Sequence, residues 1–89
     1  MALLREQFSN VFELPPEVVL DAPLLMLVGK KKMYLENHKG IALYQNDLLK
    51  IRINSGFLIL KGNSLEINQI NSHNIYISGI IKKISYEQS

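Results

Sequence analysis

The sequence predicts a small all-β domain preceded by a short amphipathic helix. From Leu24 onward, short apolar runs recur every eight to ten residues and are separated by Gly, Asn, Ser and Asp. This spacing is typical of a β-meander, sandwich or small barrel. Within runs such as 49–53 and 75–78, every second side chain is apolar, as in a strand with one buried face. The chain of 89 residues is long enough for one domain, and without cysteine it depends on apolar packing for its stability.

The first element is a helix predicted over residues 3–14. Four apolar side chains stand at positions i, i+4, i+7 and i+8, so they form one stripe along the helix. These residues are Leu4, Phe8, Val11 and Phe12. Arg5 falls mostly away from the stripe. The pair Pro15-Pro16 ends the helix because neither proline donates a backbone hydrogen bond, and residues 17–22 then form a turn or a single helical loop closed by Pro23.

The rest of the chain is predicted to form about seven to eight short strands in an antiparallel meander, folded into a small sandwich or roll. The strands are expected at residues 24–28, 32–36, 40–45, 48–54, 57–61, 65–70, 74–78 and 80–86. Turns are expected at 54–56, 61–64 and 71–74, where Gly, Asn and Ser suit unusual dihedral angles. A weak repeat at an offset of ten relates 65–70 to 75–80, so a β-solenoid is the alternative, although two copies are fewer than a solenoid needs.

The chain therefore divides into a helix with a proline-rich connector (1–23) and an all-β domain (24–89). Residues 1–21 hold one basic and four acidic side chains, a net charge of −3, whereas 22–89 hold nine basic and four acidic, a net charge of +5. The asymmetry favours head-to-tail self-association or docking on an acidic surface, and it is too small to argue for nucleic acid. The longest apolar run, Leu24–Val28, is far shorter than the ~20 residues of a membrane helix. The N-terminus lacks the apolar region of a signal peptide, so a soluble cytosolic protein is expected.

The segment 36–40 is the most distinctive candidate site. On a strand running into a turn, the side chains of Glu36 and His38 point to the same side, about 7 Å apart. A carboxylate beside an imidazole can form half of an acid–base pair or two ligands of a metal site. However, His73 is the only other histidine, and there is no cysteine. The simpler interpretation is a hairpin turn in which Asn37 and the glycine take unusual dihedral angles and Glu36 offsets nearby lysines.

Basic residues form two further candidates. Lys30–Lys32, with Lys39 across the presumed hairpin, make a small cluster whose default role is to protect a sheet edge. Nucleic-acid binding would need a larger basic stripe and exposed aromatic side chains. Arg52 lies between isoleucines on a predicted strand and is either a surface residue or an anchor for an acidic group of a partner. Motifs of phosphate loops, serine hydrolases and zinc proteases are missing, so no catalytic, cofactor-binding or metal-binding residue is predicted.

Eight segments of the chain follow one another in a familiar order. They are residues 14–15, 18–23, 27–29, 36–41, 51–54, 56–62, 65–67 and 77–81. The most recognisable of them is Glu36-Asn37-His38-Lys39-Gly40-Ile41, and the match as a whole covers roughly residues 11–86. In this order the segments resemble the YabP/YqfC family of sporulation proteins, and the short N-terminal helix makes the chain more similar to the YqfC branch. Leu24 departs from the pattern, where a polar or basic residue is expected after the proline.

The resemblance implies a role in endospore formation in the mother cell, without an established catalytic activity and with a membrane-associated sporulation protein as partner. We therefore predict a non-enzymatic structural or interaction module that forms a homo-oligomer, binds no nucleic acid, and resides in the cytoplasm or at a membrane through its partner. The candidate interaction residues are Leu4, Phe8, Val11, Phe12, Glu36, Asn37, His38, Lys39 and Arg52. The alternatives are a small enzyme or ligand-binding protein using Glu36 and His38, and a regulator that binds nucleic acid or anionic lipid through Lys30–Lys32.

Overall fold

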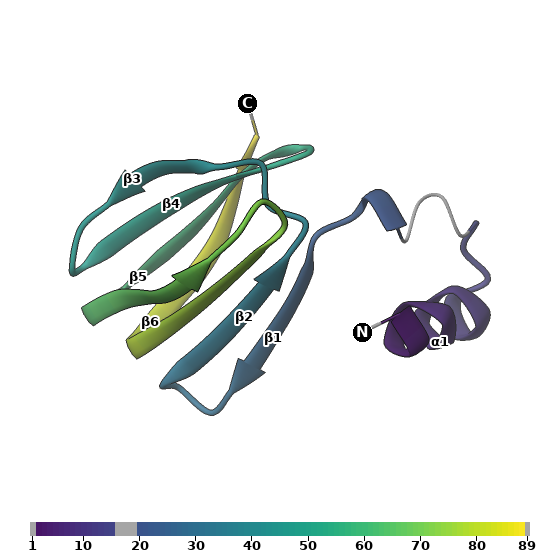
Figure 1. Ribbon diagram of the computed structural model, residues 1–89, viewed down its shortest axis with the longest axis horizontal. Coiled ribbons are helices and arrows are strands. Elements are labelled where there is room, and N and C mark those ends of the chain that lie inside the picture. The colour runs from purple at the N-terminus through teal and green to yellow at the C-terminus, as the bar shows by residue number, and fades with distance from the viewer. Residues whose placement is uncertain (1, 16–19, 89) are drawn as a thin grey trace.

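The computed structural model describes residues 2–15 and 20–88, with their side chains except those of residues 2–4 and 8. One helix and six strands make up this part of the chain (Figure 1). They are α1 (Ala2–Phe12), β1 (Leu24–Val28), β2 (Lys32–Glu36), β3 (Ile41–Tyr44), β4 (Leu48–Ile53), β5 (Gly56–Ile70) and β6 (Asn74–Gln88). The predicted helix and all-β class are confirmed, and the strands form a single antiparallel sheet in the order β1-β2-β6-β5-β4-β3.

The number of strands differs from the prediction because two pairs of expected strands are continuous. Residues 57–61 and 65–70 belong to β5, and 74–78 and 80–86 belong to β6. The expected turn at 61–64 lies inside β5, where the pairing with β6 shifts register. Gly, Asn and Ser suit a β-bulge as well as a turn, so composition alone does not separate the two.

The long β5–β6 hairpin is bent and carries the rest of the sheet. One end of β6 pairs with β2, which pairs with β1, and the opposite end of β5 pairs with β4, which pairs with β3. Figure 1 shows these two ends of the sheet folding over one another, so the sheet is a roll that is not closed into a barrel. The β-solenoid alternative is wrong, because the two segments of the apparent repeat are antiparallel neighbours in this hairpin.

Two glycines allow the hairpin to bend. A Cβ atom at Gly62 would collide with the backbone carbonyl oxygen of Ile80 on the facing strand. A Cβ atom at Gly79 would lie 2.6 Å from the carbonyl oxygen of Ser64, and Gly79 also has a φ of 130°. Both positions therefore need glycine, one for space and the other for space and backbone conformation.

The core lies between the two ends of the folded sheet. Its fully or nearly fully buried side chains are Met33, Leu35, Leu49, Ile51, Ile53, Leu58, Leu60, Leu65, Ile75, Ile77 and Ile81. The alternating residues of β4 and the first half of β6 are buried as their period-two pattern predicts. Each such aliphatic side chain contributes about 1.5–3 kcal/mol before the cost of ordering the chain.

The helix ends close to where the prolines predict. Glu13 has a φ of 55°, and the backbone N–H of Leu14 donates to the carbonyl oxygen of Ser9 at 3.0 Å. The Ser9 hydroxyl donates in turn to the carbonyl oxygen of Leu14 at 2.6 Å. These bonds satisfy backbone groups of the last helical turn. The turn expected at 17–22 falls partly outside the described residues.

Candidate interaction surface

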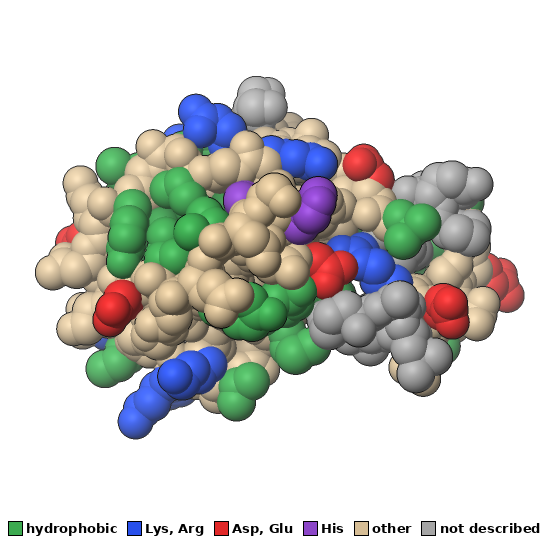
Figure 2. Space-filling model, in the orientation of Figure 1, with side chains coloured by type: hydrophobic (Ala, Val, Ile, Leu, Met, Phe, Trp, Pro, Cys, Tyr) green, Lys and Arg blue, Asp and Glu red, His purple; other side chains and the backbone are tan. Residues whose placement is uncertain are grey.

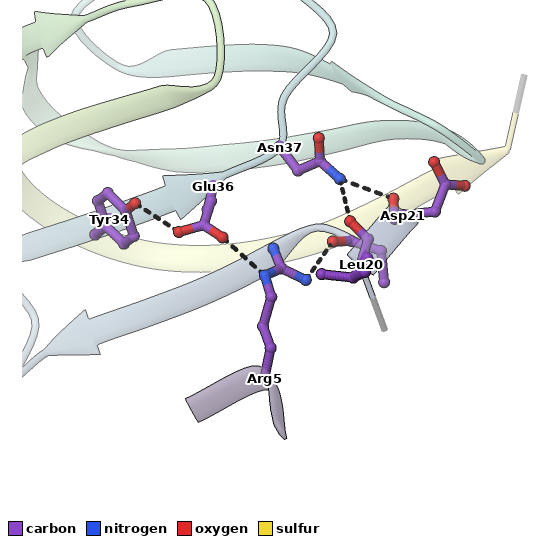
Figure 3. Close-up of polar contacts among 7 residues, drawn as sticks. Arg5, Leu20, Asp21, Tyr34, Glu36 and Asn37 are labelled. Atoms are coloured by element: carbon purple, nitrogen blue, oxygen red, sulfur yellow. Dashed lines mark hydrogen bonds and ion pairs between the residues drawn. The ribbon is translucent and has the colours of Figure 1, made fainter. Parts of the chain in front are cut away.

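Arg5 joins the helix to the sheet. Its Nε donates to Glu36 Oε1 at 2.7 Å, and its Nη1 donates to the carbonyl oxygen of Ala22 at 3.1 Å (Figure 3). Tyr34, on the same face of β2, donates its hydroxyl to the second carboxylate oxygen of Glu36 at 2.8 Å. Arg5 is only 7% exposed. We refer to Arg5, Tyr34 and Glu36 as the helix clasp.

The clasp sets the charge of its members. Partial burial acts to raise the pKa of Glu36, but the hydrogen bonds from Arg5 and Tyr34 outweigh it, so the pKa lies below its usual value. Burial and the hydrogen bond to the Glu36 carboxylate raise the pKa of Tyr34 to about 12. At neutral pH Glu36 is therefore a carboxylate and Tyr34 a neutral phenol. From the sequence, Glu36 was expected to offset the charge of nearby lysines. This is wrong, because Glu36 pairs with Arg5, which was expected to lie away from the apolar stripe of the helix.

The connector after the helix is held by two asparagine side chains. Asn37 Nδ2 donates to the carbonyl oxygens of Leu20 and Asp21 at 2.9 and 3.0 Å (Figure 3). Asn54, in the turn after β4, donates to the Asp21 carboxylate at 2.7 Å. Asp21 thus bonds to two segments that lie far from it in the sequence, which fixes where the connector enters β1.

The segment 36–40 is a crossover between the two ends of the sheet and not a hairpin turn. β2 pairs with β1 and β6, whereas β3 pairs with β4, so the strands on either side of the segment do not pair with each other. The presumed hairpin is therefore wrong, and Lys39 does not lie across it from Lys30–Lys32. The expectation of unusual dihedral angles is right: Asn37 has a φ of 73° and Gly40 a φ of 120°.

His38 is buried in this crossover, and both of its ring nitrogens are bonded. The backbone N–H of Gly40 donates to Nδ1 at 3.0 Å, so Nδ1 carries no proton, and Nε2 donates to the carbonyl oxygen of Asn71 at 2.7 Å. Glu36 bonds to the helix clasp instead of to His38. The two side chains therefore lack the mutual hydrogen bond of an acid–base pair. Within residues 2–15 and 20–88, no three His, Asp or Glu side chains are grouped so that they could hold a metal ion.

Backbone hydrogen bonds bring Arg52 beside Lys39 and Gly40 of this crossover. The N–H of Lys39 donates to the carbonyl oxygen of Arg52 at 2.7 Å. The N–H of Arg52 donates to the carbonyl oxygen of Gly40 at 2.8 Å. The Arg52 guanidinium carbon lies 5.9 Å from the ring centroid of Phe57, and Lys50 Nζ lies 4.3 Å from it. Both cations are exposed or half-buried on the outer face of the sheet, where they shield an aromatic ring from water.

The stripe of the helix is described only in its second half. Val11 is 73% exposed and Phe12 is 60% exposed, and Leu14 and Leu20 beyond them are exposed as well. The side chains of Leu4 and Phe8, which complete the predicted stripe, lie outside the described residues. The described part of the stripe, Val11 and Phe12, therefore presents apolar surface to solvent.

A hollow is lined by residues of β1, β2, β5 and β6. It has a volume of about 570 Å³ and is lined by the tilted ring pair Tyr34–Tyr76, whose centroids are 4.8 Å apart, together with Met26 and Val28. Lys32 borders it. On the face drawn in Figure 2, Lys and Arg side chains form separate groups, which is unlike the continuous basic stripe of nucleic-acid-binding proteins.

Sequence reasoning identified Glu36, Asn37 and His38 but missed Arg5 and Asn54. No spacing rule links residue 5 to residue 36, because the contact exists only after the connector has folded back along β2. The alternation of Tyr34 with Glu36 along a strand was the one available signal, since it places both side chains on one face.

Comparison with known proteins assigns the chain to a family. The family model of the YabP family matches residues 21–89. The chain is also 28% identical over 86 residues to a Bacillus subtilis protein named "Uncharacterized protein YqfC", a match that covers 97% of this chain and 92% of that protein. No solved structure matches. Among the residues that the structure describes, no helix is long and apolar enough to cross a membrane. The resemblance seen in the sequence is confirmed, and the chain belongs to the YabP family.

Proposed function

We propose that this protein is a non-enzymatic interaction module of endospore formation, acting in the mother cell by docking a membrane-associated sporulation protein through α1. Membership of the YabP family fits a sporulation-associated protein. The mother-cell compartment and the membrane-associated partner are what the resemblance of the sequence to this family implies.

The observation that carries this proposal is the contrast between the two sides of α1. The helix is fastened by the buried Arg5, while Val11 and Phe12 present apolar surface to solvent. A helix of 11 residues is marginally stable by itself in water, so such a helix gains from packing against a second surface. An amphipathic helix whose apolar side fits a groove is a common mode of recognition between proteins.

The proposal is tested by capture from sporulating cells. The tagged protein and its double variant Val11→Ser with Phe12→Ser are compared by mass spectrometry of co-purified proteins. We expect the wild type to retain a membrane-associated sporulation protein and the double variant to lose it. Tyr86→Ser is the matched control, because Tyr86 is also an exposed aromatic side chain but lies at the far end of β6. Equal capture by the wild type and the double variant would contradict the proposal.

The alternative functions have less support. A catalytic or ligand-binding role for Glu36 and His38 would require both to exchange the partners they hold in the clasp and the crossover. Binding of nucleic acid or anionic lipid through Lys30–Lys32 would weaken steeply with salt, which a titration against single-stranded DNA and phosphatidylserine vesicles measures directly.

A further inference from the structure

We propose that β1 pairs antiparallel with β1 of a second copy of this chain, about a twofold axis at Met26, so that two sheets become one. This surface is separate from the exposed side of α1 and goes beyond the proposed docking of a partner protein. The argument rests on the state of the sheet edges, the sequence of β1 and the charges at its two ends.

β1 is an edge strand without the features that keep edges from pairing. Among the described strands it pairs only with β2, from Leu24 opposite Glu36 to Val28 opposite Lys32. Its sequence, Leu-Leu-Met-Leu-Val, holds no charge and no proline, and its pairing shows no register shift. Leu27 and Val28 are 47% and 64% exposed. Natural proteins rarely leave such an edge open unless it is used.

The other edges of the sheet are protected. β3 has four residues and an irregular register, and its Tyr44 hydroxyl accepts the backbone N–H of Ile67 on the neighbouring part of β5. The part of β5 that extends beyond β4 is further closed by a bond from the Leu65 N–H to the carbonyl oxygen of Asn46. The part of β6 that continues past β2 carries Lys82 and Lys83. Charges, irregularity and covering loops all disfavour strand addition there.

The register of the proposed pair follows from the sides that the residues face. Antiparallel pairing centred on Met26 places Leu24 opposite Val28 of the second copy and Leu25 opposite Leu27. Residues directly opposite one another point to the same side of a sheet. In this register the outer-face residues of one copy lie opposite outer-face residues of the other. Leu25, which packs against the core on the inner face, lies opposite Leu27 of the second copy, which is also on the inner face. A shift of this pairing by one residue would place inner-face residues of one copy opposite outer-face residues of the other.

Charge complementarity identifies a second copy as the occupant. The segment before β1 belongs to the acidic part of the chain, with a net charge of −3 over residues 1–21, and Asp21 lies three residues before the strand. The turn after β1 carries Lys30 and Lys31, both exposed. A twofold antiparallel pair sets the acidic end of each copy beside the basic turn of the other, so both ends of the interface attract. Figure 1 shows α1 on the β1 side of the sheet, and the sequence of α1 and its last turn includes Glu6 and Glu13.

Cysteine cross-linking tests the twofold axis, because the chain has no cysteine of its own. In the full-length variant Met26→Cys, the two new thiols lie directly opposite, at a Cα separation of about 4.5–5.5 Å that suits a disulfide. Under mild oxidation we expect a covalent dimer to form at least about tenfold faster than in Tyr86→Cys, the matched variant on an exposed site outside the interface. Equal rates in the two variants would overturn the proposal.

Charge reversal at the same position provides a second measurement. The wild type is expected to sediment as a dimer, and Met26→Lys or Met26→Glu alone should weaken it by about tenfold or more, because like charges then meet across the axis. Mixing the two variants should restore a dimer containing one copy of each. A wild type that stays monomeric at high micromolar concentration, or a mixture that forms no heterodimer, would overturn the proposal. Circular dichroism of each variant establishes that its sheet has folded.

Discussion

Arg5 Nε lies 2.7 Å from Glu36 Oε1, although the two residues are separated by most of the helix, the connector and two strands. Both side chains are largely shielded from water, with relative exposures of 8% and 20%. The pair links α1 to the sheet, and the Tyr34 hydroxyl donates to the second oxygen of the same carboxylate. The bond between Arg5 and Glu36 therefore joins α1 to β2 across a long stretch of the sequence.

Glu36→Gln should release α1 while leaving the sheet folded. The substitution keeps the shape of the side chain but removes the charge that pairs with Arg5, and breaking such a shielded pair costs about 3 kcal/mol. We expect the amides of α1 to lose protection from hydrogen exchange and those of β4 and β6 to keep it. The matched control is Glu87→Gln, whose pair with Lys50 is 3.2 Å long and half-exposed, so it should change stability by less than about 1 kcal/mol. Unchanged exchange in α1 would show that the clasp does not hold the helix.

The same link should make the attachment of α1 dependent on pH. Because the folded-state pKa of Glu36 is below its usual value, the folded protein binds fewer protons than the unfolded chain in this range. The stabilisation is therefore complete above the unfolded pKa of about 4.3 and is lost as the pH falls through the folded pKa. Tyr34 acts in the opposite direction: with a pKa of about 12 in the folded state, it stabilises below about pH 10 and loses this effect toward pH 12. Measuring the free energy of unfolding as a function of pH checks both effects. Glu36→Gln should remove the part of the loss at acidic pH that Glu36 causes.

The sequence predicted the parts of the fold that depend on local pattern. Alternation in Leu49, Ile51 and Ile53 identified a strand with one buried side, and the Gly-containing turn at 54–56 was placed correctly. The bend at Gly62 was predicted as a hairpin turn, because a bulge and a turn use the same residue types. What distinguishes them is the close approach of Ile80, which is a property of the folded hairpin.

The candidate site was predictable to the same limited degree. Glu36, Asn37 and His38 stand out by their chemistry, and the structure places all three in the crossover or at its start. Their partners were not predictable, since Arg5, Asn71 and Asp21 come from distant parts of the chain and no periodicity relates them. The expected contact of Glu36 with lysines failed for this reason.

Substitution of the glycines should separate steric from conformational cost. Gly62→Ala is expected to destabilise by about 3 kcal/mol or more, or to prevent folding, because its Cβ would meet the backbone of Ile80, which has no flexible end to move. Gly40→Ala meets no atom within 4 Å and should cost only the strain of its φ of 120°, about 1–3 kcal/mol. Urea denaturation of both variants measures the difference. A smaller loss for Gly62→Ala than for Gly40→Ala would contradict the bend described for β5.

Removal of residues 1–13 should leave the all-β domain folded. The described core residues all belong to strands β2, β4, β5 and β6, and the clasp connects α1 to a carboxylate on the outer face of β2 and not to that core. We expect the truncated chain to unfold cooperatively in urea, with a free energy of unfolding within about 1 kcal/mol of that of Glu36→Gln, in which the clasp is already broken.

The truncated chain should lose the captured sporulation protein, because Val11 and Phe12 are gone. It should still cross-link through Met26→Cys, because β1 and Asp21 remain. Cross-linking should become less sensitive to salt, since the truncation removes the negative charges of Glu6 and Glu13. A truncated chain that fails to fold would show instead that α1 completes the core, and the exposed stripe would then have to be explained as part of the domain's own packing.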